Sequence, residues 1–265
     1  MTTLRLADIT FAYGDRVILE HLSLTVADGE FLVVLGASGG GKTTLLRLIA
    51  GLAAPTTGQI FFADEEVRAP SPQRGIVFQD YALFPWYSLR DNVALAVAKS
   101  EPRLSRRERR ERAAEYLRAV GLGDAAAKYP HELSGGMRQR GALARTLALG
   151  SPLLLLDEPF GALDPHNRAR LQNLLLEIWR AATPRRTVIF VTHDIDEALL
   201  LGDRIIALGS NPGRIIGEIK IDAPRPRSRE DIITAENFRS YRAAIQACYC
   251  RRDDDEAVDG DGGGI

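Results

Sequence analysis

Apolar and polar residues alternate in two stretches near the start of the chain, residues 4–11 and 18–26. A period of two turns successive side chains to opposite faces, so each stretch is predicted to form a strand with one buried face. Residues 31–35 are apolar without interruption, a pattern typical of a strand that is buried on both faces of a sheet. Further strands are predicted at residues 59–62 and 75–78.

The pattern changes after Gln79. Helical spacing predicts three helices, at residues 90–97, 105–120 and 135–148. Ser105 and Glu108 fit a capping box at the start of the second helix. Strands are then predicted at residues 153–156, 187–192, 204–208 and 215–221, with helices at 165–181 and 194–201. Because strands and helices alternate, we expect an α/β fold with a mostly parallel sheet and an inserted helical segment.

A basic run, residues 106–112, lies at the start of the second predicted helix and contains five arginines and two glutamates. The favoured interpretation is a solvent-exposed helix face, because acidic residues are interleaved with the basic ones. Nucleic-acid binding is the alternative. The formal net charge of the whole chain is −1, which does not favour nucleic acid as a partner.

The length of 265 residues is normal for one α/β domain with an insertion. No apolar run approaches the roughly 20 residues that span a bilayer, and the N-terminus lacks the apolar core of a signal peptide. We therefore expect a cytoplasmic protein that reaches a membrane only through a partner. Cys248 and Cys250 have no histidine nearby and are expected to be reduced thiols. Residues 251–265 are acidic and then glycine-rich, which predicts a disordered tail.

A glycine-rich loop follows the apolar strand of residues 31–35, and a segment with helical spacing follows the loop. The loop matches the P-loop pattern in full and consists of Gly36, Ala37, Ser38, Gly39, Gly40, Gly41, Lys42, Thr43 and Thr44. Its glycines allow successive backbone N–H groups to face one centre, so the loop is predicted to bind phosphate. Lys42 is expected to contact the β- and γ-phosphates of a nucleotide, and the Thr43 hydroxyl to ligate Mg²⁺.

Four polar side chains follow predicted strands. Asp157 and Glu158 come directly after four leucines. Asp157 is expected to hold Mg²⁺ through water, and Glu158 to position and deprotonate the attacking water. His193 and Gln79 each end another predicted strand; the imidazole can bond the γ-phosphate or water, and the amide can reach Mg²⁺ or water. For His193 and Gln79 taken alone, a structural role is the alternative.

The segment Leu133-Ser134-Gly135-Gly136-Met137-Arg138-Gln139-Arg140 resembles the signature sequence of the ABC ATPases. The resemblance covers residues 3–245 and implies a P-loop ATPase core, an antiparallel β part near the N-terminus and an inserted helical subdomain. It also implies that Ser134, Gly135 and Gly136 complete the ATP site of a second subunit. Met137 stands where the family most often has glutamine, which puts a polar contact from this position in doubt.

The same resemblance implies roles for single residues. Tyr13 resembles the aromatic residue that stacks on adenine, Asp164 the D-loop aspartate, Gln79 the Q-loop glutamine and His193 the switch histidine. ATP and Mg²⁺ are the implied cofactors. The implied ABC domain, residues 1–245, comprises a nucleotide-binding core (1–87 and 149–225), a helical signature subdomain (88–148) and a C-terminal helix (226–245).

Residues 84–93, 210–215 and 223–227 resemble importers of nitrate, sulfonates and taurine. Trp86 is interpreted as part of the contact with a permease, with a packed structural aromatic as the alternative. The resemblance implies a homodimer, or a heterodimer with another ABC ATPase, on the inner face of the membrane. Its other partners are a membrane permease and, indirectly, an extracytoplasmic substrate-binding protein, with no nucleic acid. A soluble ABC ATPase acting on nucleic acid or ribosomes is the alternative function.

Overall fold

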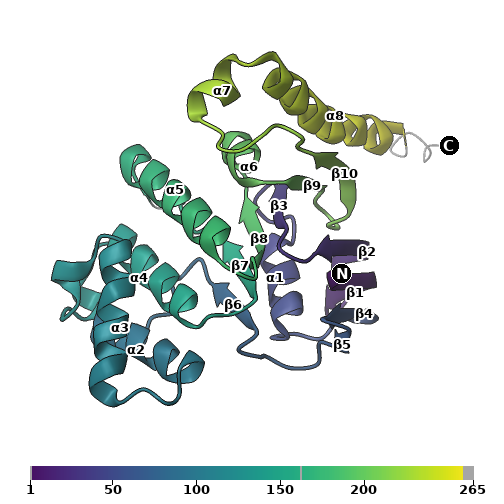
Figure 1. Cartoon of the computed structure of the whole chain (residues 1–265). Coiled ribbons are helices and arrows are strands. Elements are labelled where there is room, and N and C mark those ends of the chain that lie inside the picture. The colour runs from purple at the N-terminus through teal and green to yellow at the C-terminus, as the bar shows by residue number, and fades with distance from the viewer. Residues whose placement is uncertain (1, 162, 259–265) are drawn as a thin grey trace. The chain divides into compact units, whose positions relative to one another are not determined.

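The structure, a computed structural model, describes the backbone of residues 2–161 and 163–258, and the side chains of this part except residues 2, 3 and 251–258 (Figure 1). The chain divides into two compact units. The first contains residues 1–48, 53–67 and 189–265, and the second contains residues 49–52 and 68–188. Each unit is therefore assembled from segments that are distant in the sequence.

The first unit contains a four-stranded sheet in the order β2-β1-β4-β5, and all its neighbouring strands are antiparallel. The strands are β1 (Thr2–Tyr13), β2 (Arg16–Ala27), β4 (Thr57–Phe62) and β5 (Glu65–Glu66). This sheet is the antiparallel part near the N-terminus that the sequence analysis expected, and that expectation is confirmed.

Register shifts between β1 and β2 keep the apolar residues of this sheet on one face. In β1 the buried residues Leu4 and Leu6 are followed by Ile9, which strict alternation would turn to the opposite face. The register with β2 shifts between Leu6 and Ile9, and Asp8 has a positive φ of 50°. The extra residue returns Ile9 to the buried face. His21 of β2 has the same φ, and its Nδ1 lies 2.9 Å from Asp8 Oδ1.

The other strands that lie wholly or mainly in the first unit follow the order β10-β9-β3-β8. They are β3 (Phe31–Gly36), β8 (Thr187–Thr192), β9 (Arg204–Leu208) and β10 (Ile215–Lys220). Strand β3 pairs with β9 in parallel, and β10 pairs with β9 antiparallel. Every residue of β3 and β8 is buried, as expected for strands covered on both faces. Helix α1 (Lys42–Ala50) follows β3, and α6 (Ile195–Leu201) follows β8.

Two helices end the described chain, α7 (Arg229–Thr234) and α8 (Glu236–Val258), where the sequence analysis predicted one helix at residues 226–245. The predicted disordered tail begins at Arg251, inside α8; residues 259–265 lie outside the described part of the chain. The Tyr249 hydroxyl donates a hydrogen bond of 2.9 Å to the carbonyl of Leu35, next to the glycine loop. Burial raises the pKa of Tyr249 to about 12, so the phenol keeps the proton that this bond requires.

The second unit combines two parallel strands with a group of helices in mutual contact, α2, α3 and α4 (Figure 1). Its elements are β6 (Arg74–Val77), α2 (Leu89–Ser100), α3 (Arg106–Ala119), α4 (Gly135–Ala148), β7 (Leu153–Asp157) and α5 (Pro165–Ala181). The predicted capping box of Ser105 and Glu108 is present at the start of α3. Within the described residues, no helix has the length and apolar character that a bilayer crossing requires.

Candidate functional site

The glycine loop turns sharply between the end of β3 and the start of α1. Gly39 and Gly41 have φ values of +83° and +87°, a region that favours glycine because other residues meet a steric penalty there. At Gly41 a Cβ atom would also lie 2.6 Å from the Leu19 side chain. The Gly40 N–H donates to the Ala37 carbonyl at 3.2 Å. The loop therefore has the tight curvature that a phosphate-binding loop requires.

Lys42, the first residue of α1, is only 5% exposed. Its Nζ donates to the carbonyls of Gly36 and Ala37, at 2.9 and 2.8 Å, so the ammonium group is held against the loop itself. The first turn of α1 has no acidic residue, which leaves the positive end of the helix dipole without a negative side chain from that turn. The donor groups of this loop fit an anionic phosphate chain.

Two other predicted site residues belong to the same unit. Tyr13 ends β1, is 54% exposed and makes an edge-on contact with Phe11, so much of its ring is accessible for stacking. His193 follows the last residue of β8, a strand next to β3 in the sheet order. The glycine loop and His193 therefore both come directly after strands that are neighbours in the sheet.

The predicted carboxylates lie in the second unit. Asp157 is the buried last residue of β7, and Glu158 follows with a positive φ of 45°. Such a conformation costs energy in a residue other than glycine and is concentrated at functional sites. The Gln139 side chain on α4 donates a hydrogen bond of 3.3 Å to the Glu158 carbonyl. Gln139 belongs to the signature segment, and its place in the sequence by itself indicates no contact with Glu158.

The signature segment forms the N-terminus of α4. Ser134 is the N-cap, and its hydroxyl accepts a hydrogen bond of 3.3 Å from the Met137 N–H. A Cβ atom at Gly135 would meet nothing within 4 Å, and the first turn of α4 has no acidic residue. Met137 contributes its backbone to this cap, so the departure from glutamine leaves the cap intact.

Asp164 is the N-cap of α5 and accepts hydrogen bonds from both the backbone and the side chain of Asn167, at 3.0 and 2.6 Å. These bonds lower the pKa of Asp164. Gln79 is exposed after β6, and Tyr81 and Ala82 have positive φ values of 67° and 41°. Among the described residues no group of three His, Cys, Asp or Glu side chains could hold a metal ion. The expected Mg²⁺ donors are instead a hydroxyl, an amide and a carboxylate.

A buried asparagine organises the aromatic segment of residues 84–88. The Asn92 amide nitrogen donates to the carbonyls of Phe84, Tyr87 and Ser88, each at 3.1 Å, and its oxygen accepts from the Phe84 N–H at 2.8 Å. Trp86, in the middle of the segment, is 66% exposed. No role for Asn92 was predicted from the sequence, although asparagine is an unfavourable residue inside a helix and so marks a special position.

Replacing Asn92 with alanine is expected to destabilise the second unit by at least about 3 kcal/mol, because its two amide hydrogens and its oxygen lose hydrogen bonds of about 1 kcal/mol each. Thermal unfolding measures this loss, and limited proteolysis is expected to cut within residues 84–88. Asn173→Ala, at an exposed position on α5, is the matched control. Equal melting temperatures for the two variants would contradict the role of Asn92.

The sequence profile of the family described as ABC transporter matches residues 19–161, which is more than half of the chain. The chain belongs to this family. It is 45% identical over 246 residues to the nitrate import ATP-binding protein NrtD of Synechococcus elongatus, covering 91% of this chain and 89% of that protein. It is also 48% identical over 233 residues to the bicarbonate transport ATP-binding protein CmpC of the same species, covering 88% of this chain and 35% of that protein.

Solved structures agree with this assignment. A dimeric structure of MJ0796, described as a bacterial ABC transporter cassette, superposes with a TM-score of 0.76 at 33% sequence identity. The alignment covers 83% of this ABC-family chain and all of the solved chain. A second dimeric structure of MJ0796, in a post-hydrolysis state bound to ADP and Pi, has a TM-score of 0.75. The predicted family and fold are confirmed, and the roles of the single site residues remain predictions.

Proposed function

We propose that this ABC-family chain binds and hydrolyses ATP with Mg²⁺ and thereby powers the import of a small anion across the membrane. The main observation in favour of nucleotide binding is the tight glycine loop, in which Lys42 donates hydrogen bonds to two loop carbonyls. The similarity to nitrate and bicarbonate transport proteins supports the transport function. We place the protein in the cytoplasm, on the inner face of the membrane.

The nucleotide is bound mainly by residues of the first unit. Backbone N–H groups of residues 36–44 and the Lys42 ammonium group bind the β- and γ-phosphates, and the Tyr13 ring stacks on adenine. Thr43, Gln79 and Asp157 hold Mg²⁺ directly or through water. When bound, Mg²⁺ supplies positive charge that stabilises the negative charge on the phosphate oxygens.

Hydrolysis requires a positioned water molecule. The water oxygen forms a bond to the γ-phosphorus while the bond from that phosphorus to the bridging oxygen breaks, and ADP leaves with the electron pair. Glu158 takes a proton from this water. His193 and Gln79 orient the water and the γ-phosphate, and Lys42 compensates the charge of the transition state.

A second subunit completes the reaction. We propose that two ABC ATPase chains, identical or homologous, face each other head to tail, so that Ser134, Gly135 and Gly136 of one chain bind the ATP held by the other. The Ser134-capped N-terminus of α4 supplies backbone N–H groups suited to an anion. Asp164 lies in the D-loop of the same interface. The dimeric structures of the MJ0796 cassette support this arrangement.

The aromatic segment after Gln79 is proposed to bind a cytoplasmic helix of the permease. A largely apolar cavity of about 720 Å³ in the second unit is lined by residues of this segment, α2 and α4, among them Phe84, Leu95 and Leu149. The exposed Trp86 and Tyr87 rings lie in the same segment. Exposed aromatic residues are typical anchors of protein interfaces.

We retain the proposed division into a nucleotide-binding core (1–87 and 149–225), a helical signature subdomain (88–148) and a C-terminal part (226–245). The transported anion is proposed to be of the nitrate, sulfonate or taurine type, and an extracytoplasmic receptor delivers it to the permease. The alternative, a soluble ABC ATPase that acts on nucleic acid or ribosomes, is not favoured by the transport proteins to which the chain is similar.

Affinity purification from solubilised membranes of the source cell tests this function. The tagged chain is expected to recover a permease with several membrane spans, and the reconstituted complex to hydrolyse ATP faster when receptor and anion are added. A Trp86→Ala/Tyr87→Ala variant is expected to lose the permease while keeping basal ATPase activity. Recovery of ribosomes or nucleic acid in place of a permease would favour the alternative function.

Gln139→Leu is expected to lower kcat about tenfold or more with little change in KM for ATP, because small displacements of a catalytic group are costly. The substitution removes the hydrogen bond to the Glu158 carbonyl. It also removes the buried Gln139 Oε1, which has no hydrogen-bond partner among the described residues, so little stability is lost. Steady-state kinetics measure kcat and KM for ATP separately. The exposed Gln246→Leu variant is the control. An unchanged kcat would exclude Gln139 as a positioning residue.

A further inference from the structure

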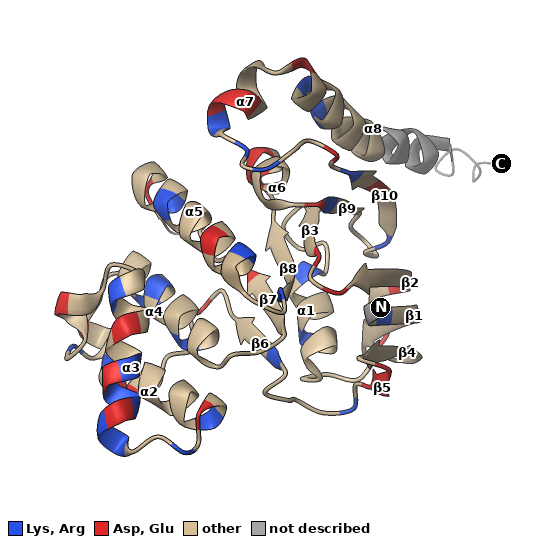
Figure 2. Cartoon of the chain, viewed as in Figure 1, with Lys and Arg blue, Asp and Glu red and all other residues tan. Residues whose placement is uncertain are grey.

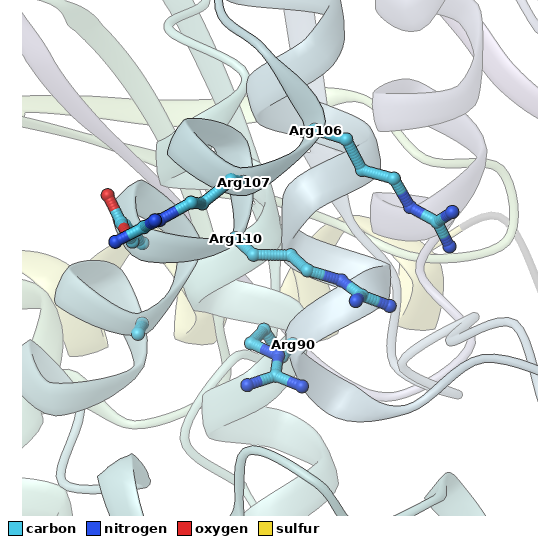
Figure 3. A pocket seen from close by; sticks show the side chains of 6 residues that line it. Arg90, Arg106, Arg107 and Arg110 are labelled. Carbon is cyan, nitrogen blue, oxygen red and sulfur yellow. The ribbon is translucent and has the colours of Figure 1, made fainter.

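Arginines from two helices line a cavity of about 590 Å³ in the second unit. The lining residues are Arg90, Arg106, Arg107, Arg110, Glu111 and Ala114. Arg90 lies in the first turn of α2, and the other three arginines lie in the first two turns of α3 (Figure 3). Figure 2 shows basic and acidic residues along α3, so the charge of each arginine has to be assessed against its carboxylate neighbours.

Two of the four arginines are paired with carboxylates. Arg107 Nε lies 2.9 Å from Glu111 Oε1, and Figure 3 shows its side chain running in the opposite direction from those of Arg106 and Arg110. Arg110 binds both carboxylate oxygens of Asp91, at 2.8 and 3.2 Å. Burial by itself raises the pKa of Asp91, but hydrogen bonds, foremost from Arg110, outweigh it, and the pKa is lowered.

The other two arginines are not compensated in this way. Arg90 and Arg106 form no ion pair among the described residues, although Arg90 interacts electrostatically with Asp91, and Arg90 Nε is buried without a hydrogen-bond partner. Both lie in the first turn of a helix, where the positive end of the helix dipole disfavours a cation, and each of these turns also holds one acidic residue, Asp91 or Glu108. Four arginines line the cavity, and only two carboxylates, Asp91 and Glu111, are paired with them, so an excess of positive charge remains that favours binding of an anion.

We propose that this cavity binds a phosphate group, either as a soluble phosphate compound or as the headgroup of a phospholipid. A guanidinium group matches phosphate oxygens with two parallel hydrogen bonds. Four arginines and the two carboxylates paired with them leave an excess of two positive charges, which balances the charge of a phosphate monoester, about −1.5 to −2 at neutral pH. The proposal concerns residues of the second unit and does not depend on the ATPase function, since the glycine loop belongs to the first unit.

The test uses the full chain carrying Lys42→Ala, so that the glycine loop does not contribute to binding. One arm titrates inorganic pyrophosphate by calorimetry, and the other measures co-sedimentation with phosphatidylglycerol vesicles against phosphatidylcholine vesicles. Arg90→Gln/Arg106→Gln is expected to weaken binding at least about tenfold, since two charge-assisted contacts are lost. Arg103→Gln/Arg118→Gln removes the same charge from exposed positions outside the lining and is expected to bind as the parent does.

The arms distinguish the two sources. Pyrophosphate binding that depends on Arg90 and Arg106 assigns a soluble phosphate compound, and vesicle binding that depends on them assigns a lipid headgroup. Equal loss in the two double variants overturns the proposal, because general net charge then explains the binding. Absence of binding in both arms also overturns it. If the double variant does not fold, the exposed single variant Arg106→Gln is expected to show about a threefold loss.

Discussion

Replacing Glu158 with glutamine is expected to lower ATP turnover by about 10²- to 10⁴-fold, the usual contribution of a general base, while ATP binding stays nearly unchanged. The amide has the shape of the carboxylate but does not accept a proton from the attacking water. The position of residue 158 is set largely by its backbone, which has a φ of 45° and accepts a hydrogen bond from Gln139. The substitution is therefore expected to remove the chemistry and preserve the local structure.

Phosphate release and equilibrium ATP binding measure the two effects separately. The Glu158→Gln chain is also expected to sediment as an ATP-bound dimer, because the closed pair is no longer reopened by hydrolysis. Glu177→Gln, at an exposed position on α5, is the matched control and is expected to turn over ATP normally. Unchanged turnover in the Glu158 variant would falsify its assignment as the base.

Replacing Lys42 with alanine is expected to weaken ATP binding by about 100-fold or more. A hydrogen bond to a charged group contributes about 1.5–3 kcal/mol, and a loss of about 3 kcal/mol corresponds to a factor of about 100 in Kd. The ammonium group now donates to the carbonyls of Gly36 and Ala37. Its loss therefore removes both the phosphate contact and the bonds that close the loop, and some loss of thermal stability is expected as well.

Calorimetric titration with ATP in the presence of Mg²⁺ measures the change in affinity. Lys220→Ala removes an equal charge from the same unit at an exposed position paired with Asp222, and this variant is expected to bind ATP as the unmodified chain does. Circular dichroism establishes that both variants are folded. Comparable ATP affinities for the two variants would remove Lys42 from the proposed site.

Sequence alone predicted the glycine loop and the capping box of Ser105 and Glu108, because each depends on residues that are close neighbours in the chain. The φ values of Gly39 and Gly41 and the cap from Ser105 to Glu108 are decided by backbone sterics and by hydrogen bonds across three residues. Burial of β3 was also predictable, because an uninterrupted apolar run leaves neither face suited to water. The family resemblance then supplied roles that local patterns do not determine.

The strand bulges, the contacts of Asn92 and Gln139, and the arginine cavity were not predictable from these patterns. The alternation in β1 does not specify that Asp8 takes the positive φ that brings Ile9 to the buried face. Gln139 reaches the carbonyl of Glu158 from 19 residues away, and Arg90 joins arginines of a different helix at one cavity.

The sequence by itself therefore determined every strand except β5, most of the helices and the glycine loop, because short-range sterics and hydrogen bonding dictate them. Only the tertiary structure decided which side chains from separate elements line one cavity, which of them bind a distant backbone carbonyl, and which charged groups form ion pairs. These contacts depend on the path of the chain and on the packing of distant segments, and the local pattern of apolar and polar residues does not predict them.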